Sequence, residues 1–190
     1  MKKTIITLCA FLISVTIFAQ NSNNKDSFTE HKGNWEIAAL FGSINFDNTE
    51  TLHVKDNINV GFTMEATRKF ENNFFLNAGV SFSSGKELGN LYENPLTYFS
   101  VNADVGYRFK SKEIPKPFVV PYVAVGGSYI NAANTLPNAE SSYSINATLG
   151  FIFWLNQSNW GLTIRDTYKF INSDYMVNHN QILVGLRYKL

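Results

Sequence analysis

The chain has 190 residues, enough for one domain with a substantial core, and its 16 Lys and Arg residues nearly balance its 15 Asp and Glu residues. This balance leaves no basic surplus of the kind that binds nucleic acid, so we expect no nucleic-acid partner. The many aromatic residues, 16 Phe and 9 Tyr among them, are typical of a strand-rich chain.

Residues 1–19 have the features of a secretory signal peptide. Lys2 and Lys3 form a short basic region, residues 5–18 are an apolar run, and Ala19 is a small residue at the expected cleavage site. The run is too short to predict a membrane-spanning helix.

The segment that follows is a polar lead-in. Residues 20–33 are rich in Asn and Ser and show no periodicity, which predicts a flexible N-terminal segment. The single cysteine, Cys9, lies in the predicted signal, so we expect neither a disulfide nor thiol chemistry in the mature chain.

From residue 34 onward, apolar and polar residues alternate in eight stretches, which is the period of a strand with two different faces. An even number of antiparallel strands of about ten residues is what a membrane-spanning barrel requires. The sequence therefore predicts an all-β fold, an eight-stranded antiparallel up-and-down transmembrane β-barrel over residues 34–190, with the last strand pairing with the first. The predicted strands cover residues 34–46, 57–70, 74–84, 96–109, 118–131, 141–154, 160–170 and 181–190.

The connections between these strands alternate in length. Outer-membrane barrels have short periplasmic turns and longer outside loops, so this order places both ends of the barrel in the periplasm. Loops on a rigid scaffold commonly bind partners, and an extracellular ligand is expected at the longer set. The longer connections are 47–56, 85–95, 132–140 and 171–179, and the shorter ones are 71–73, 110–117 and 155–159.

The distribution of aromatic residues predicts which face meets lipid. They gather near both ends of the apolar faces, as in the aromatic girdles that bracket the apolar band of a membrane barrel. Gly and small polar residues crowd the opposite faces, which suits a narrow lumen. The girdle residues are Trp35, Phe70, Phe74, Phe109, Phe118, Phe153, Trp160 and Tyr188 at the turn side, and Phe41, Phe62, Phe82, Phe99, Tyr129, Tyr143, Phe170 and Tyr175 at the loop side.

Nine charged residues are predicted to point into the lumen. An eight-stranded barrel is just wide enough for side chains, and buried charges need partners, so we expect a plugged interior rather than a pore. Glu36 is the expected partner of Arg187 and Lys189. The predicted charge network comprises Glu36, Glu65, Asp104, Arg108, Arg165 and Arg187, with Lys69, Lys169 and Lys189 also inward.

Three residues disturb the pattern. Arg68 falls on the lipid face close to the turn-side rim, where a long side chain can reach water. Asp166 falls on the lipid face within its strand, and we expect either a bulge that turns it inward or a position near the outer rim. Pro121 lacks a backbone donor, which also predicts a bulge or kink.

The histidines offer no defensible catalytic motif. His53 lies near Glu50 and Asp56, and His179 follows Ser173 and Asp174, but neither spacing matches a known nucleophile and base arrangement. We find no metal-ligand spacing and no phosphate-binding loop, and we expect no cofactor and no enzymatic activity. Two alternatives stay open: a narrow porin-like channel, and an outer-membrane enzyme acting on lipid A.

The C-terminal segment Gly185-x-x-Tyr188-x-Leu190 is similar to the signal that the barrel-assembly machinery reads, although the last residue is Leu where Phe is usual. Together with the export signal and the strand count, it makes residues 34–190 resemble the OmpA/OmpX-type barrels of Gram-negative outer membranes. The resemblance implies surroundings of outer-membrane lipid and lipopolysaccharide, and a closed barrel predicts a monomer. The fold class does not give the function, and the long loops make a structural or surface-interaction role, such as adhesion, the expected one.

Overall fold

The computed structural model describes residues 34–46, 58–84, 97–109, 118–133, 141–155, 158–172 and 176–190. The predicted signal peptide, the lead-in segment and most of each long loop lie outside these residues. In the described part of the chain, no helix is both long and apolar enough to cross a membrane.

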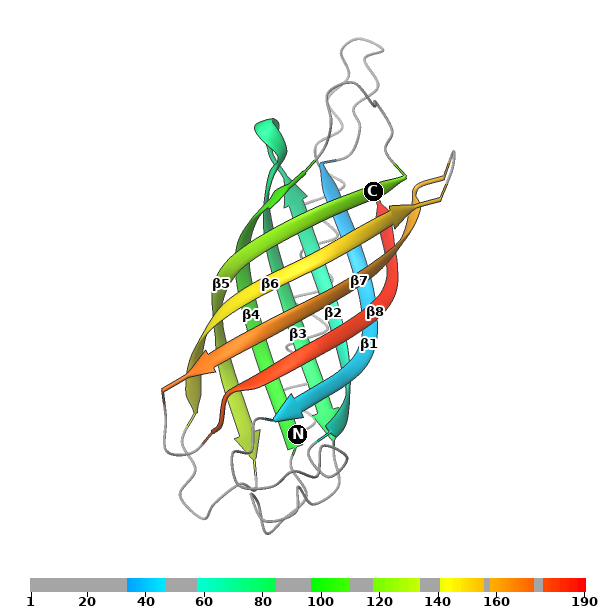
Figure 1. The fold of residues 1–190 in the computed structure, drawn as a ribbon. Helices are drawn as coiled ribbons and strands as arrows, with labels where there is room; N and C mark the ends of the chain where they lie inside the picture. Colours follow the sequence, from blue (N-terminus) through cyan, green and yellow to red (C-terminus); the bar gives the residue numbers. More distant parts are fainter. Residues whose placement is uncertain are drawn as a thin grey trace. The chain divides into compact units, whose positions relative to one another are not determined.

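Eight antiparallel strands follow one another around a closed barrel, as the sequence predicts (Figure 1). The strand ends differ from the predicted ones by no more than two residues, because the alternation that defines a strand fades gradually into the flanking loops. The strands are β1 (Trp35–Phe46), β2 (Ile58–Lys69), β3 (Phe74–Ser84), β4 (Thr97–Arg108), β5 (Val119–Ala133), β6 (Ser142–Trp154), β7 (Trp160–Ile171) and β8 (His179–Lys189).

The first and last strands close the barrel. β1 pairs with β2 on one side and with β8 on the other, in a register that runs from Glu36 opposite Lys189 to Phe46 opposite His179. Every strand therefore has two neighbours, and no strand edge of the barrel is left unpaired. This confirms the predicted pairing of the last strand with the first.

The connection between β2 and β3 is the tight turn that the sequence predicts. A single 3-10 turn, η2 (Glu71–Asn73), contains Asn72 and Asn73 with φ values of 62° and 68°. This left-handed region is one that Asn tolerates better than most residues do. The Phe70 amide donates to the Phe74 carbonyl at 2.9 Å, which closes the turn.

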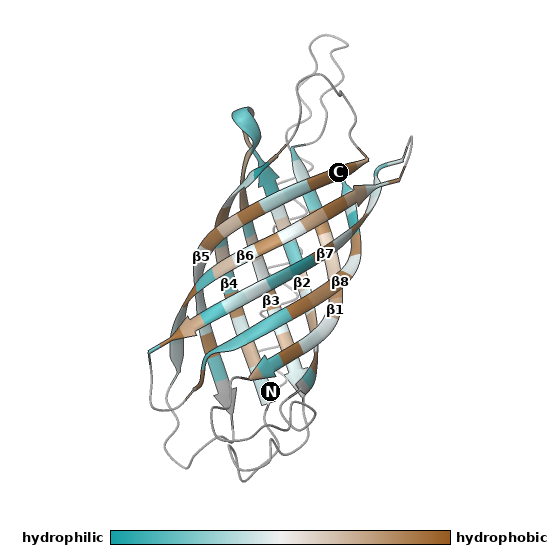
Figure 2. Ribbon diagram, viewed as in Figure 1, coloured by the Kyte–Doolittle hydropathy of each residue, from teal (hydrophilic) through white to brown (hydrophobic). Residues whose placement is uncertain are grey.

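Apolar side chains cover the outside of the barrel. Figure 2 shows polar and apolar residues alternating along the strands, and large apolar side chains such as Val60, Tyr143 and Ile145 are more than 70% exposed. A soluble protein would bury such a surface, whereas a membrane barrel presents it to lipid.

Aromatic rings on neighbouring strands touch at both ends of this surface. At the loop end, from which the longer connections leave, the Phe41 and Phe62 ring centroids lie 4.9 Å apart. At the turn end, the Trp160 and Tyr188 centroids lie 4.8 Å apart. The outward Arg68 guanidinium lies 5.7 Å from the Trp35 ring centroid. Members of both predicted groups thus form contacts across strands. Tyr175, predicted for the loop-side group, lies outside the described residues.

Of the two alternatives expected at Pro121, the bulge is wrong, and the local kink stays a prediction. The register between β5 and β6 runs through Pro121 opposite Phe151 without interruption. The Pro121 carbonyl accepts from the Phe109 amide at 2.9 Å, just beyond the end of β4. The nitrogen of Pro121, which has no hydrogen to donate, therefore faces Phe109, the residue after the last one of β4. No hydrogen bond within the paired part of the strands is lost, so no bulge is needed.

Of the two alternatives expected for Asp166, the bulge that turns it inward is wrong, and the position near the outer rim stays a prediction. The register of β7 is continuous with β6 and β8, so Asp166 lies opposite Leu149 on one side and Ile182 on the other. Its neighbours Arg165 and Thr167 are buried in the lumen, and strict alternation then leaves the exposed Asp166 on the outside.

Candidate functional site

The inner faces of the strands fill the lumen with a layered set of side chains. All nine predicted inward charges lie on these faces, and seven of them are buried. From the turn end to the loop end, the layers are an apolar cap, a charge cluster, a hydrogen-bonded polar layer and a second apolar cap.

Glu36 is the first centre of the charge cluster. Arg108, which reaches across the lumen from β4, binds it in a bidentate manner, with nitrogen–oxygen distances of 2.9 and 2.7 Å. Arg187 on the neighbouring β8 donates to the same carboxylate at 3.2 Å, and the Lys69 ammonium lies 3.5 Å away. The structure therefore contains the expected pair of Glu36 and Arg187, and adds two further cations.

Glu65 is the second centre. Its two carboxylate oxygens contact Arg165 and Arg187, the latter at 3.1 Å, and Asn77 donates to it at 3.2 Å. Arg187 bridges both carboxylates and also donates to Thr67 at 2.8 Å and Thr163 at 3.0 Å. One guanidinium on β8 thus joins groups on β1, β2 and β7.

Asp104 lies beside a small cavity. Unlike Glu36 and Glu65, it takes part in none of the ion pairs described above. Its carboxylate accepts a hydrogen bond from Asn146 at 3.1 Å. The cavity, which Arg108, Arg165 and Tyr122 also line, has a volume of about 10 Å³, room for roughly one water molecule. A space of this size does not form a continuous aqueous channel.

Lys169 organises the polar layer. Its ammonium donates to the Tyr98 hydroxyl at 3.0 Å, to Ser100 at 3.0 Å and to Asn102 at 2.7 Å. These contacts use all three donors of the ammonium group. Gln181 donates to the same Tyr98 hydroxyl at 3.0 Å.

A chain of hydrogen bonds connects the polar layer to Asp104. Ser128 donates to Asn102 at 2.7 Å, and Asn146 donates to Ser128 at 2.7 Å and onward to Asp104. These side chains come from β4, β5 and β6, so the network ties neighbouring strands from the inside.

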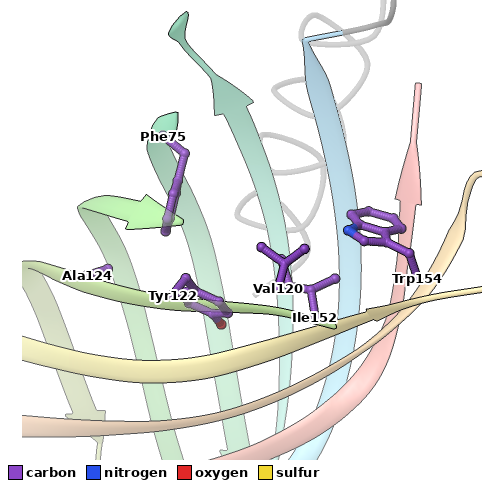
Figure 3. Close-up of a cluster of buried hydrophobic side chains, with 6 residues drawn as sticks. All are labelled: Phe75, Val120, Tyr122, Ala124, Ile152 and Trp154. Atoms are coloured by element: carbon purple, nitrogen blue, oxygen red, sulfur yellow. The ribbon is translucent and has the colours of Figure 1, made fainter. Parts of the chain in front are cut away.

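Apolar side chains cap the turn end of the lumen (Figure 3). Glycines on neighbouring strands make room for the large rings: a Cβ at Gly106 would overlap Phe75, and one at Gly150 would overlap Tyr122. The Lys189 ammonium lies 3.5 Å from the Trp154 ring centroid. The turn-end cap consists of Phe75, Val120, Tyr122, Ala124, Ile152 and Trp154.

A second cap closes the loop end. It consists of Ile44, Phe46, Tyr98, Ile130 and Met176, all at most 3% exposed. His179, predicted to end an exposed loop, starts β8 instead and is buried beside this cap, with Nε2 3.1 Å from the Tyr98 hydroxyl.

Both caps were missed at the level of sequence because the inner faces read as polar. The sequence did contain a signal for the caps, because residues that are an even number of positions apart in a strand lie on the same face. Phe75 is two residues from the inward Asn77, and Tyr98 is two residues from the inward Ser100, so each lies on the inner face. Large apolar residues at the ends of polar faces therefore pointed inward as well.

Across the described ranges, no group of three or more His, Cys, Asp and Glu side chains is placed to hold a metal ion. The His179 ring contacts a hydroxyl and the Val177 carbonyl, and it lies under a cap rather than in an open cleft. The candidate set around His53 lies outside the described residues.

Of the C-terminal motif, Gly185 and Tyr188 lie on β8 at the seam, and Leu190 directly follows the strand. Gly185 lies opposite Leu40, where a Cβ would overlap the backbone of β1. Tyr188 packs against Trp160, and the Leu190 amide donates to the Trp35 carbonyl at 3.0 Å. The segment therefore completes the seam at the turn end.

Comparison with known proteins gives a family and a fold. Residues 6–189 match the family model for the outer membrane protein beta-barrel domain. Among curated proteins the chain has no significant match.

Solved structures of bacterial surface proteins share the fold. Neisserial surface protein A (NspA) aligns with a TM-score of 0.64 at 13% identity, covering 83% of this chain and 97% of that one. Ail, the attachment invasion locus protein of Yersinia pestis, gives 0.53 at 19% identity, covering 82% and 96%. The outer membrane enzyme PagL gives 0.51 at 8% identity, covering 82% and 99%. At these identities the likeness concerns the fold alone.

Proposed function

Because the chain belongs to the outer membrane protein β-barrel family, we propose that it is an integral protein of the bacterial outer membrane with a structural or surface-interaction role. Its barrel is a rigid scaffold for the four longer connections. Both ends of the barrel strands, Trp35 and Lys189, then lie on the periplasmic side, and the longer loops face outward.

The filled lumen is the observation that carries this proposal. Between the two caps, buried charges are held by partners on several strands, and such a network stiffens the barrel. A stiff barrel with a closed interior offers its loops as the surface for a partner. The solved relatives include a protein whose name describes attachment and invasion, which agrees with a role of this kind.

Loop replacement in living cells tests the proposal. Segments 47–56, 85–95, 134–140 and 173–175 are each replaced by Gly/Ser linkers of equal length, leaving the buried Met176 and His179 intact. The same replacement of 110–117, at the opposite end, is the matched control. We expect attachment to a surface to fall in at least one loop variant and to be unchanged in the control.

The alternative of a lipid A enzyme rests on the fold shared with PagL. Lipid A from cells with and without the protein is compared by mass spectrometry. We expect identical acyl patterns. A difference that disappears in a His179→Ala variant, with the barrel still folded, would replace the proposed role with an enzymatic one.

A further inference from the structure

Arg68 is a cation on the outer surface that the charge cluster in the lumen does not use. Of the four arginines in the sequence, the other three contact carboxylates inside the barrel. Arg68 lies on the opposite face of β2 and is exposed. Among the side chains that the structure describes, no carboxylate lies within ion-pair distance of it. Its guanidinium, with five N–H donors, therefore has no anionic partner within the described part of the chain.

Two aromatic rings hold this guanidinium at the turn end of the barrel. Its central carbon, Cζ, lies 5.7 Å from the Trp35 ring centroid and 5.6 Å from the Phe70 ring centroid. Trp35 lies directly opposite Arg68 on β1, and Phe70 directly follows the last residue of β2. Cation–π contacts limit the freedom of the long side chain without using its N–H donors. Arg68 is thus held among the turn-end aromatics, which lie at the level of the lipid headgroups in a membrane barrel.

A shallow apolar groove begins beside Arg68 and crosses four strands on the outer face. We call it the outer groove. Its floor consists of residues with little or no side chain that lie opposite one another in register, and rows of larger apolar residues form its two walls. The floor is Ala66, Ala78, Ala103 and Gly127, the wall on the Arg68 side is Leu76, Val105 and Val125, and the other wall is Met64, Val80, Val101 and Tyr129.

The outer groove runs from the turn end toward the middle of the barrel. Ala66 lies four residues from the turn-end aromatic Phe70, whereas Gly127 lies nine residues from the turn-end aromatic Phe118. Three strand spacings of about 4.8 Å give the groove a length of about 14 Å. This is close to half of the ~30 Å hydrocarbon core of a bilayer, so the groove has the length of an acyl chain within one leaflet.

A cation at the headgroup level and an apolar groove beside it correspond to the two parts of one ligand. Phosphate is the anion of lipid headgroups, and the guanidinium fork binds phosphate oxygens in a bidentate manner. A soluble anion would leave the groove empty, and a purely apolar ligand would leave the guanidinium without an acceptor. We propose that Arg68 and the outer groove bind one glycerophospholipid, with its phosphate on Arg68 and one acyl chain along the groove floor. This inference rests on the membrane location proposed above and not on the role of the loops.

Native mass spectrometry of the purified full chain in detergent tests the phosphate contact. The probe is phosphatidylglycerol, and diacylglycerol, which has the same chains but no phosphate, is the control ligand. We expect Arg68→Gln to lower the affinity for phosphatidylglycerol by about tenfold. Arg68→Lys keeps the charge but not the bidentate fork, and we expect a loss of about threefold. Diacylglycerol should bind weakly and equally to all three proteins.

A second pair of variants tests the outer groove. Ala78→Leu fills the groove floor on β3, and Ala147→Leu places the same side chain on the outer face of β6, away from the groove. Both alanines are exposed, so neither change alters the lumen. We expect Ala78→Leu to lower the affinity for phosphatidylglycerol by about fourfold, the effect of removing one methylene contact, and Ala147→Leu to leave it unchanged. Heat-modifiable mobility on gels shows that each variant is folded.

Three results would overturn the lipid site. These are unchanged phosphatidylglycerol binding in Arg68→Gln, equal binding of diacylglycerol and phosphatidylglycerol to the unmodified chain, and equal effects of Ala78→Leu and Ala147→Leu. Lipopolysaccharide that binds in preference to phosphatidylglycerol and is lost in Arg68→Gln would replace the glycerophospholipid as the ligand. Loop replacement measures attachment by cells, whereas these measurements use purified protein and alter no loop, so either proposal can fail without the other.

Discussion

Single residues hold the interior together through shared partners. Glu36 is fully buried and accepts from Arg108 and Arg187. Its loss leaves Arg108 without its carboxylate partner and removes one of the two carboxylates that Arg187 bridges. Removing one partner of a buried ion pair costs more stability than the intact pair contributes, because the remaining charge stays buried without an opposite charge.

We expect Glu36→Ala to lower the free energy of unfolding by about 3–5 kcal/mol. Urea titration of the refolded barrel in lipid vesicles, followed by Trp fluorescence, measures the change. Lys69→Met is the matched control: its ammonium is 3.5 Å from Glu36 but 20% exposed, and we expect an effect below about 1 kcal/mol. Equal effects of the two substitutions would contradict the central role of Glu36.

The Tyr98 hydroxyl has a comparable role in the polar layer. It accepts from Lys169 and Gln181 and contacts His179, so Tyr98→Phe leaves buried donors without a partner. We expect a loss of about 1–3 kcal/mol in the same titration. Tyr143→Phe, on the exposed outer surface, should change stability by less than about 0.5 kcal/mol. A neutral Tyr98→Phe would show that the hydroxyl is dispensable.

At the scale of one element, β8 has two separable roles. It closes the seam with β1, and its last residues resemble an assembly signal. We expect deletion of Tyr188–Leu190 to abolish insertion into the outer membrane of cells. Heat-modifiable barrel in outer-membrane fractions, assayed on gels, would show the prediction to be wrong.

A second substitution distinguishes the signal from the strand. Tyr188→Ser removes the aromatic ring and its packing on Trp160 but keeps every backbone pair. If the ring is part of the signal, this variant refolds in vesicles but inserts poorly in cells. Impaired refolding in vesicles as well would assign the defect to the strand.

At the scale of the whole molecule, the two apolar caps, the charge cluster and the polar layer fill the lumen. We expect purified protein in planar bilayers to show no large, steady conductance. Removing the turn-end cap with Tyr122→Ala and Trp154→Ala should leave the conductance unchanged, because the charge cluster and the loop-end cap remain. Steady conductance from the unmodified protein would favour the narrow-channel alternative.

The sequence by itself determined the strands, their number and the face on which most of the side chains lie. Alternation is a local property with period two, so it can be read from neighbouring residues in the chain. It was enough to place Glu36, Arg108 and Arg187 in the lumen and to pair the last strand with the first. It failed where aromatic residues were assumed to lie on the outer face, since Phe75 and Tyr98 point into the lumen.

Only the tertiary structure decided which inward side chains meet. Arg108 on β4 reaches Glu36 on β1, and Lys169 on β7 reaches Tyr98 on β4, in both cases across the lumen. Such contacts depend on the stagger accumulated over all eight strands when the barrel closes, which no local pattern encodes. The same closure left Asp166 on the outside and drew His179 within, because a continuous register fixes every side chain of a strand at once.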